Sequence, residues 1–463
     1  MRVPWSEEEW RRVVVYGMGK SGIAATRLLR ARGVAVVAVD GRRDVAMGDL
    51  EGDPMIELRL GDEGLSLPEG VDGLVLSPGV PRTSPLVRAA ESRALPVIAE
   101  VELAFPFLDG EVVAVTGSNG KSTTATLTAA MLEESNVPAV LCGNIGEPLA
   151  AQVDSSADAQ SSGRVFVVEL SSFQLETVRT FKARAAALLN VTPDHMDRYA
   201  DFAAYAAAKA RIFERQDERS IAVLNADDAP TKAIGDGVER ARKRWFSSRG
   251  RVADGCFVEA GAVIEVAPGS DPTELFTVAE MAMVGSHNTE NAMAASMLAL
   301  AAGGDRASLR RVVSRFDGLP HRTRRVRERN GVAWYDDSKG TNVGATLKSL
   351  DGFPDRTVHL ILGGVGKGQD FAPLRDTVAR KAKAVYLIGA AAAPIEAALA
   401  GVVPVRRSET LDRAVAQAAT AAVRGDVVLL SPACASFDQF NDYAHRGRRF
   451  QELVASLEDG GNE

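Results

Sequence analysis

The residues best suited to chemistry lie in the loop that follows Val112–Val115, which reads Thr-Gly-Ser-Asn-Gly-Lys-Ser-Thr. The four apolar residues predict a short buried strand, and the loop is rich in residues that tolerate positive φ. Lys121 opens a predicted helix that runs to Leu132. The loop amides and the helix N-terminus would therefore face an anion such as a phosphate. Lys121 would reach the outer phosphates of a nucleotide, and the hydroxyl of Ser122 could ligate magnesium.

This loop departs from the usual eight-residue phosphate-binding pattern. The first glycine of that pattern would fall at position 115, where this chain has Val115, and Gly117 precedes Gly120 instead. A tight strand-to-helix turn that happens to end in Gly-Lys-Ser is the alternative interpretation. Strand, loop and helix follow one another in the order that phosphate binding requires, which favours a nucleotide site.

A second glycine-rich turn lies near the N-terminus. Residues 12–17 predict a strand, Gly17-Met-Gly-Lys-Ser-Gly follows, and the next predicted strand, 34–39, ends at Asp40. This arrangement is typical of dinucleotide binding, in which backbone approaches a pyrophosphate and an acid lies near a ribose. Taken alone it indicates an NAD(P) oxidoreductase. A UDP group offers the same pyrophosphate and ribose, and a structural turn that needs small residues is a third possibility. A further predicted strand, 71–76, ends in Ser77-Pro-Gly at the same sheet edge.

Three other side chains stand where chemistry is possible. The predicted strand 165–170 contains Glu169, which suits a magnesium ligand or a water-orienting residue, unless it is a paired structural acid. His195 lies in the loop after the predicted strand 185–190, where a lone histidine could merely cap a turn. Lys209 lies in the Ala-rich helix 202–213, and by composition alone it is a solvated lysine.

The elements that position these residues predict an α/β protein of three domains. The length of 463 residues fits about three domains. The strand–helix pattern restarts around residue 100, and Gly-Leu-Pro at 318–320 breaks the chain again, so we expect domains over 1–99, 100–318 and 319–463. The polar, Ser-rich segment 151–164 predicts a surface loop, and 218–284 is rich in predicted strands. The last predicted strands each end in small or polar residues, which indicates one ligand edge, and they cover 331–335, 359–362, 384–388 and 427–430.

Composition excludes several classes of protein. A net charge of −7 and a pI of about 5.5 argue against a nucleic-acid-binding surface. No apolar run reaches the ~18 residues of a membrane span, and the acidic start MRVPWSEEEW does not resemble a secretion signal. The cysteines, Cys142, Cys256 and Cys434, are far apart and form no CxxC, which suits a reducing cytoplasm and buried hydrophobic roles.

Four stretches together resemble the ATP-dependent Mur ligases, and within them the branch that adds D-glutamate. They begin at Glu169 (Glu-Leu-Ser-Ser-Phe-Gln-Leu), Asn190 (Asn-Val-Thr-Pro-Asp-His-Met-Asp-Arg-Tyr), Asp337 (Asp-Ser-Lys-Gly-Thr-Asn-Val) and Ser431 (Ser-Pro-Ala-Cys-Ala-Ser-Phe-Asp-Gln-Phe). The resemblance runs from about residue 12 to residue 450, and the last stretch is the most specific to this branch. The shortened phosphate-binding loop is also what this family would show.

The resemblance implies amide formation in two steps. ATP phosphorylates the carboxylate of UDP-N-acetylmuramoyl-L-alanine, and the amine of D-glutamate then attacks the acyl phosphate and releases phosphate. An N-terminal Rossmann-like domain would bind the UDP end, a central P-loop ATPase-type domain would bind ATP, and a C-terminal Rossmann-like domain would bind D-glutamate. The family also implies peptidoglycan precursor synthesis by a cytoplasmic enzyme, which we expect to be a monomer.

The resemblance further assigns residues to ligands. ATP would be bound by Gly117, Ser118, Asn119, Gly120, Lys121, Ser122, Thr123, Asn291, Arg322 and Asp337. The UDP substrate would be bound by Lys20, Ser21, Asp40, Gly41, Arg42, Ser77 and Asn144. D-Glutamate would be bound by Thr341, Lys367, Ser436 and Phe437. The catalytic set would be Lys121, Glu169, His195 and Lys209.

Two magnesium ions follow from the same resemblance. Ser122 and Glu169 would hold one ion, and His195 and Lys209 the second. Lys209 would be carbamylated, because an ammonium group cannot ligate magnesium whereas a carbamate can.

Two alternatives belong to other classes of protein. An NAD-dependent oxidoreductase would explain the N-terminal glycine turn but not the Lys121 loop or Glu169. A nucleotide-dependent switch or scaffold would usually carry an Asn-Lys-x-Asp signature for guanine, which this chain lacks.

Overall fold

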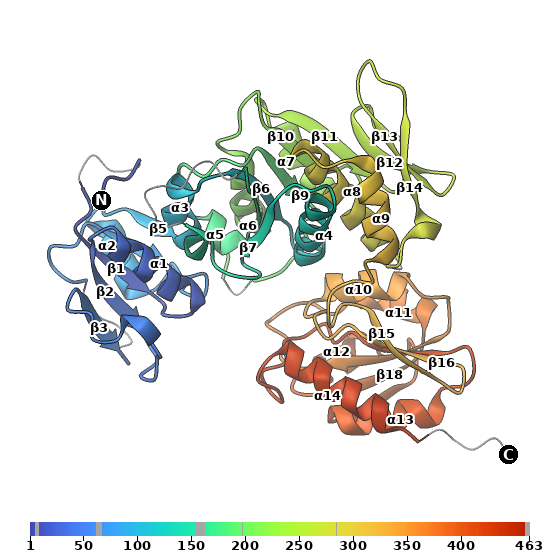
Figure 1. Cartoon of the computed structure of the whole chain (residues 1–463). Coiled ribbons are helices and arrows are strands. Elements are labelled where there is room, and N and C mark those ends of the chain that lie inside the picture. Colours follow the sequence, from blue (N-terminus) through green and yellow to red (C-terminus); the bar gives the residue numbers. More distant parts are fainter. Residues whose placement is uncertain (5–8, 62–66, 154–162, 197, 284, 459–463) are drawn as a thin grey trace. The chain divides into compact units, whose positions relative to one another are not determined.

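The computed structural model describes residues 1–4, 9–61, 67–153, 163–196, 198–283 and 285–458. Asp197, Val284 and most of the predicted surface loop 151–164 lie outside the described residues. Within them the chain forms three β-sheets flanked by helices, which confirms the α/β class and the three-sheet architecture expected from the sequence (Figure 1).

The first sheet has the order β3-β2-β1-β4-β5, and all its strands are parallel. Its strands are β1 (Arg12–Tyr16), β2 (Ala35–Asp40), β3 (Ile56–Leu60), β4 (Gly73–Leu76) and β5 (Val97–Ala99). The helices are α1 (Lys20–Ala31), α2 (Pro85–Ser92) and α3 (Glu100–Ala104), with short 3₁₀ helices η1 (Gly48–Leu50) and η2 (Phe105–Phe107). Alternate residues of β1, β2 and β4 pack with α2, and α1 also contacts these three strands. Cover by more than one helix explains why the strands read as continuous apolar runs.

The second sheet has the order β14-β13-β12-β11-β10-β9-β6-β8-β7. It is parallel from β7 to β12, and β13 and β14 add an antiparallel extension. Its strands are β6 (Glu111–Thr116), β7 (Ala139–Gly143), β8 (Val165–Glu169), β9 (Ala185–Leu188), β10 (Ile221–Asn225), β11 (Arg242–Ser247), β12 (Gly255–Glu259), β13 (Ala262–Val266) and β14 (Thr273–Thr277).

The helices that accompany this sheet in the sequence vary in length. They are α4 (Lys121–Glu134), η3 (Leu149–Gln152), α5 (Ser172–Leu175), α6 (Phe202–Ala210), η4 (Arg211–Phe213), α7 (Ala229–Asp236), η5 (Val278–Glu280), α8 (Ser286–Ala301) and α9 (Arg306–Arg315).

The third sheet has the order β15-β16-β20-β17-β18-β19, in which only β15 is antiparallel. Its strands are β15 (Arg324–Arg329), β16 (Val332–Asp336), β17 (Val358–Gly363), β18 (Ala382–Ile388), β19 (Val405–Glu409) and β20 (Val427–Leu430). The helices are α10 (Val343–Asp351), α11 (Leu374–Lys381), α12 (Ala392–Ala398), α13 (Leu411–Ala421) and α14 (Tyr443–Ser456).

Alternate residues of the central strands of this third sheet build two separate cores. Leu360 and Leu362 of β17 pack with α10, α11 and α12, whereas Ile361 packs with α13 and α14 on the other face. Successive side chains of a strand point to opposite faces, so a strand covered on both sides is apolar throughout. Because β16, β20, β17 and β18 are parallel, their carboxyl ends share one edge, as the sequence predicted.

The chain divides into two compact units. The first comprises Met1–Val191, Ala203–Thr277 and Asn291–Val312 and holds the first two sheets. The second comprises Thr192–Phe202, Val278–Glu290 and Val313–Glu463 and holds the third sheet. The loop that carries His195 therefore belongs to the second unit, although its sequence lies between strands of the second sheet. The domain boundaries at 99/100 and 318/319 stay predictions.

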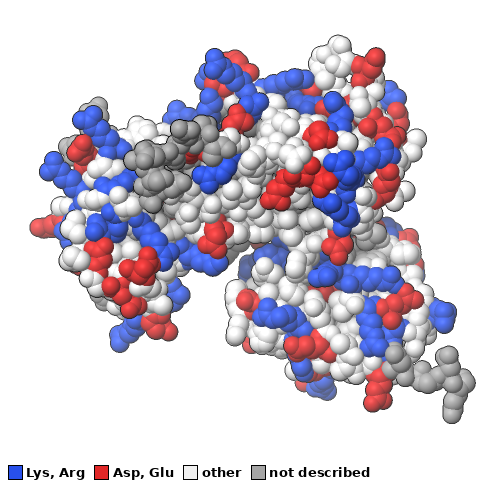
Figure 2. Space-filling model, in the orientation of Figure 1, with Lys and Arg blue, Asp and Glu red and all other residues white. Residues whose placement is uncertain are grey.

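The three cysteines are buried and unpaired, as the sequence predicted. Burial raises the pKa of the Cys142 and Cys434 thiols to about 12, and it raises the pKa of Cys256 as well. Within the part of the chain that the structure describes, no helix is both long and apolar enough to cross a membrane. On the face drawn in Figure 2, Lys and Arg side chains alternate with Asp and Glu.

Candidate nucleotide and substrate sites

The phosphate-binding loop leaves β6 at Thr116 and enters α4 at Lys121. Asn190, which follows β9, holds it from the side: Asn190 Oδ1 accepts Asn119 N at 2.9 Å, and Asn190 Nδ2 donates to Asn119 O at 3.1 Å. Lys121 Nζ folds back on the loop and donates to Gly117 O (2.9 Å) and Ser118 O (3.0 Å). These bonds hold the shape of the loop, whose lysine would meet a phosphate.

Only glycine fits at position 120 without a shift of its surroundings. Its φ is +86°, and a Cβ at this position would lie 2.2 Å from Asn291 Oδ1. Thr124 Oγ1 of α4 donates to the same Asn291 oxygen at 3.4 Å. The structure therefore places Asn291, predicted to bind ATP, directly against the end of the loop.

Lys209 on α6 is only 2% exposed, so the solvated lysine that composition indicated is wrong. Its Nζ donates to Gly117 O at 2.9 Å and lies 4.7 Å from the centroid of the Tyr205 ring. The Tyr205 hydroxyl in turn is 3.0 Å from Ser118 Oγ. Sequence reasoning missed Tyr205, although its spacing of four residues from Lys209 puts both on one helix face.

Glu169 ends β8, and its backbone pairs with Val115 of β6, beside the phosphate-binding loop. Its Oε1 accepts Asn144 Nδ2 at 2.7 Å, whereas its buried Oε2 has no hydrogen-bond partner. A buried carboxylate oxygen without a donor fits a magnesium ligand, because it supplies the hard anionic oxygen that this ion prefers. Asn144, predicted to bind the sugar-peptide end, contacts Glu169, and its contact with substrate stays a prediction.

The described residues contain no cluster of three or more His, Cys, Asp or Glu side chains with metal-site geometry. Magnesium usually takes one or two carboxylates together with substrate phosphates and waters, so a site built on Glu169 and Ser122 does not need such a cluster. His195 belongs to the second unit, whereas Glu169 and Lys209 belong to the first. The pairing of His195 with Lys209 at a second ion stays a prediction.

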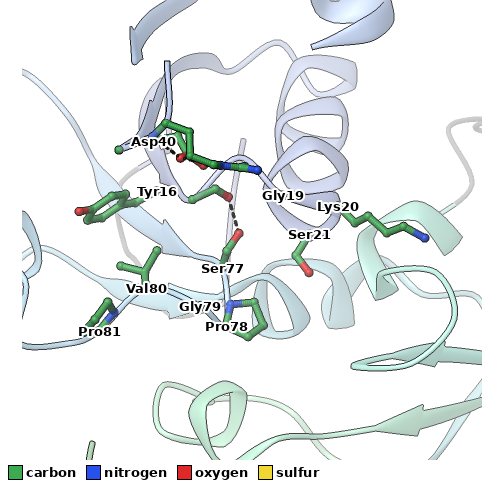
Figure 3. Close-up of a pocket in the computed structure, with 13 residues that line it drawn as sticks. Tyr16, Gly19, Lys20, Ser21, Asp40, Ser77, Pro78, Gly79, Val80 and Pro81 are labelled. Atoms are coloured by element: carbon green, nitrogen blue, oxygen red, sulfur yellow. Dashed lines mark hydrogen bonds and ion pairs between the residues drawn. The ribbon is translucent and has the colours of Figure 1, made fainter. Parts of the chain in front are cut away.

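A cavity of about 450 Å³ opens at the carboxyl edge of the first sheet, within the size range of small-molecule sites. It lies between the glycine turn after β1, the end of β2 and the turn after β4 (Figure 3). Six of the seven residues predicted to bind the UDP substrate line it, namely Lys20, Ser21, Asp40, Gly41, Arg42 and Ser77. Asn144 does not line it.

Asp40 shapes the turn that borders this cavity. Its Oδ2 accepts Met18 N at 2.7 Å, its Oδ1 accepts Arg42 N at 2.8 Å, and the Arg42 guanidinium binds both oxygens. Burial opposes ionisation of Asp40, but the hydrogen bonds from Arg42 and Met18 outweigh it and hold its pKa below the usual range. Ser77 Oγ donates to Gly17 O at 2.5 Å (Figure 3). A Cβ at Gly22 would lie 2.0 Å from that same oxygen. The glycines thus permit the close approach of helix to loop that the fingerprint requires.

In the second unit, the loops after β17 and β20 lie side by side. Val365 N donates to Ala435 O at 2.8 Å, and Ala435 N donates to Val365 O at 3.0 Å. Lys367 and Ser436 follow these two residues, so both lie at the same sheet edge. Their contact with D-glutamate stays a prediction. Thr341 follows β16, the next strand but one, and Phe437 is 73% exposed. The four predicted residues therefore come from loops at one edge.

Asp337 connects several elements at this edge. It accepts hydrogen bonds from Ser349 Oγ (2.6 Å), Ser431 Oγ (2.7 Å) and Thr323 N (3.1 Å). Burial raises the pKa of Asp337 to about 6, against the opposing effects of these bonds and of the Arg322 charge. The structure thus brings Arg322 and Asp337 together, and their contact with ATP stays a prediction.

Sequence reasoning missed two further groups at this edge. The Arg446 guanidinium is buried and donates to neutral acceptors among the described residues: Ser338 Oγ at 2.9 Å, Ser338 O at 2.8 Å and Cys434 O at 3.1 Å. Burial lowers the pKa of Arg446 to about 10. Lys339 Nζ lies 3.8 Å from the ring centroid of Tyr443. Helix α14 reads as polar, so its sequence did not indicate a buried cation.

Three family models match the chain in the order of its sheets. They are "Mur ligase MurD-like, N-terminal domain" over 11–99, "Mur ligase middle domain" over 115–299 and "Mur ligase, glutamate ligase domain" over 321–434. A UDP-N-acetylmuramoylalanine--D-glutamate ligase from Koribacter versatilis (strain Ellin345) is 44% identical, over 96% of this chain and 98% of the relative. The chain belongs to the Mur ligase family. A ligase of the same name from Myxococcus xanthus (strain DK1622) is 42% identical to this Mur ligase, over 96% and 98% of the two chains.

Solved structures give the same fold for this Mur ligase. UDP-N-acetylmuramate-alanine ligase MurC from Thermotoga maritima matches with a TM-score of 0.59 at 17% identity, over 97% of this chain and 100% of that one. MurF ligase from Thermotoga maritima in complex with ADP matches with a TM-score of 0.58 at 17% identity, over 96% and 95%.

Proposed function

We propose that this Mur ligase joins D-glutamate to UDP-N-acetylmuramoyl-L-alanine at the expense of ATP, in peptidoglycan precursor synthesis. The observation that carries this function is relatedness over nearly the whole chain to ligases with that name, at 40% identity or more. The phosphate-binding loop and the edge that holds Lys367 and Ser436 support it, since they offer separate sites for a nucleotide and a dicarboxylate.

In the proposed reaction, each substrate is held by its own set of residues. Lys121 and the loop amides hold and neutralise the outer phosphates of ATP while the substrate carboxylate takes the terminal phosphoryl group. The amine of D-glutamate then forms the amide bond, and phosphate leaves. Lys367 holds a carboxylate of D-glutamate, and the hydroxyls of Thr341 and Ser436 donate hydrogen bonds to it. The cavity beside Asp40 takes the uracil nucleotide.

Magnesium is part of the proposed reaction. The unpartnered Glu169 Oε2 and the Ser122 hydroxyl would hold one ion, which neutralises phosphate charge. A second would use His195 and a carbamylated Lys209. Burial disfavours the ammonium form of a lysine and so favours the neutral amine that reacts with carbon dioxide. Isotopically labelled bicarbonate should give a carbamate NMR signal that is absent from Lys209→Gln, and the same signal in both proteins would contradict the assignment.

A phosphate-release assay tests the function directly. Phosphate should appear at a high rate only when ATP, magnesium, UDP-N-acetylmuramoyl-L-alanine and D-glutamate are all present. Replacing D-glutamate with L-glutamate, or omitting either acceptor, gives the control rates. Lys121→Ala should lower the rate by several orders of magnitude, because it removes stabilisation of the transferring phosphoryl group. Rapid ATP hydrolysis without D-glutamate would contradict the proposal.

The N-terminal cavity separates this function from an oxidoreductase. Calorimetry should show binding of the UDP substrate, and NAD should neither bind tightly nor be displaced by it. Tight NAD binding that the UDP substrate does not compete with would contradict this assignment and favour a dinucleotide site at the glycine turn.

A further inference from the structure

Asp194 lies between two side chains that the proposed function assigns to different parts of the reaction. Its Oδ1 lies 3.6 Å from Lys367 Nζ, and its Oδ2 lies 3.6 Å from His195 Nε2. Asn342 Nδ2 donates to Oδ2 at 3.1 Å, and the backbone N of His195 donates to Oδ1 at 3.0 Å. The Asp194 side chain is 12% exposed, so solvent screens these contacts only in part. All four residues belong to the second unit.

The backbone on both sides of this contact is in a sparsely populated conformation. His195 has φ +57° and Lys367 has φ +50°, which are uncommon for residues other than glycine. Such conformations are strained and persist where the surrounding structure holds them. The two loops are therefore held so that the carboxylate of one faces the cation of the other.

The contacts of Asp194 differ in strength. The bonds from Asn342 and from the His195 backbone have hydrogen-bond distances, whereas 3.6 Å to Lys367 Nζ is an ion pair without a direct hydrogen bond. An incoming carboxylate at hydrogen-bond distance would bind the ammonium better than Asp194 does. Asp194 would lose that pair and keep its anchors on Asn342 and on its own loop.

We propose that Asp194 is a positioning residue whose carboxylate occupies Lys367 until D-glutamate displaces it. This inference rests on the proposed function, which gives Lys367 to a carboxylate of D-glutamate. In the empty site Asp194 keeps the Lys367 ammonium paired. When D-glutamate binds, its carboxylate takes over the ammonium, and Asp194 keeps its contacts with Asn342 and His195. D-Glutamate binding at β17 is thereby linked to the orientation of His195.

Removing the charge of Asp194 should improve the binding of D-glutamate, although Asp194 lies next to the proposed site. Asp194→Asn keeps the shape and an oxygen for Asn342 but no longer competes for Lys367. The KM for D-glutamate should fall by about 2- to 5-fold, the range expected for loss of a partly exposed ion pair. The kcat should also fall, because His195 loses its carboxylate neighbour. The KM values for ATP and for the UDP substrate should not change.

Direct binding gives a readout that does not depend on turnover. D-Glutamate is titrated by calorimetry into protein that holds UDP-N-acetylmuramoyl-L-alanine and a non-hydrolysable ATP analogue. Its Kd should be lower for Asp194→Asn than for the wild type by the same factor as the KM. Asp194→Glu, which keeps the charge, should return Kd toward the wild-type value. Asp376→Asn is the matched control, because Asp376 is an exposed carboxylate on α11 of the same unit.

The outcomes are distinct. A higher KM and Kd in Asp194→Asn would mean that Asp194 contacts D-glutamate itself, for example its ammonium, and would overturn the proposal. An unchanged Kd with a lower kcat would reduce Asp194 to a support for His195 and would also overturn it. If thermal unfolding shows that Asp194→Asn does not fold, Asp194→Ser carries the same test. A wild-type protein without D-glutamate-dependent phosphate release would instead refute the proposed function.

Discussion

Glu100 is a single carboxyl group whose environment is set entirely by the fold. It lies at the start of α3, is 1% exposed, and accepts a hydrogen bond from Ala150 N through Oε1. Its buried Oε2 has no hydrogen-bond partner. Burial raises the pKa of Glu100 to about 7, against the opposing effect of the Ala150 bond. Folding therefore favours the protonated acid.

The stability of the first unit should consequently fall as the pH rises. The contribution of a group whose folded pKa is raised is fully present below its usual pKa near 4.5 and is lost as pH passes through about 7. Glu100→Gln resembles the neutral acid, so its melting temperature should exceed that of the wild type only slightly at pH 5 and by more at pH 8. The difference is at most about 3 kcal/mol, or a few degrees. Thermal unfolding of both proteins at the two pH values checks this, and an equal difference at both would contradict it.

Single residues differed in how far the sequence could place them. Glu169 could be assigned because a buried apolar strand leads directly to it, and the ends of parallel strands share an edge. The burial of Lys209 could not be read from the Ala-rich helix, because alanine does not distinguish the covered face from the exposed one. Tyr205 and Arg446 were missed for a different reason, because their partners, Ser118 and Ser338, are distant in sequence.

At the scale of elements, the loop between β6 and α4 depends on one backbone conformation. Gly120→Ala would place a methyl group 2.2 Å from Asn291 Oδ1 at a φ of +86°. The loop must then shift away from Asn291, so the KM for ATP should rise by about 5- to 150-fold, the equivalent of 1–3 kcal/mol. Steady-state kinetics with ATP as the varied substrate measures this change.

The control for that substitution is Gly250→Ala. A Cβ at Gly250 would meet no atom within 4 Å, and its φ is not in the left-handed region. It should leave the KM for ATP unchanged. An unchanged KM in Gly120→Ala as well would mean that the loop does not hold the nucleotide in the way described.

The strands that the sequence predicted are those covered on both faces. β1, β6, β8, β17 and β20 each have a mainly apolar and buried centre, and their observed bounds agree with the predicted ranges within two residues. The edge strands β3, β15 and β19 were not anticipated, because they read Ile-Glu-Leu-Arg-Leu, Arg-Arg-Val-Arg-Glu-Arg and Val-Arg-Arg-Ser-Glu. Charged residues on edge strands prevent pairing with other chains, and they also hide the strand signal.

At the scale of the whole molecule, the residues proposed to bind ATP phosphates and those proposed to bind D-glutamate belong to different units. Lys367→Ala should therefore weaken use of D-glutamate by about 10- to 150-fold, the value of a charge-assisted hydrogen bond. The KM for ATP should change little, because Lys121 is in the first unit. The exposed Lys232 on α7 provides the matched control, Lys232→Ala. A normal KM for D-glutamate in Lys367→Ala would remove Lys367 from the site.

Breaks in the strand–helix pattern were sufficient to predict three α/β segments, because each segment has its own sheet. They could not predict that 192–202 joins the second unit, because that depends on contacts such as Asn342 with Asp194, which are distant in sequence. The monomeric state and the cytoplasmic location stay predictions.

The three buried cysteines have a practical consequence for following this molecule at work. Maleimide dyes react with exposed thiolates, and a buried thiol whose pKa is about 12 presents neither exposure nor charge at neutral pH. The natural chain is therefore a nearly silent background for fluorescent labelling. A cysteine introduced at exposed Lys232 in the first unit and another at exposed Asp376 in the second would carry a donor and an acceptor dye. Energy transfer between the dyes would then report the separation of the two units through each stage of the catalytic cycle.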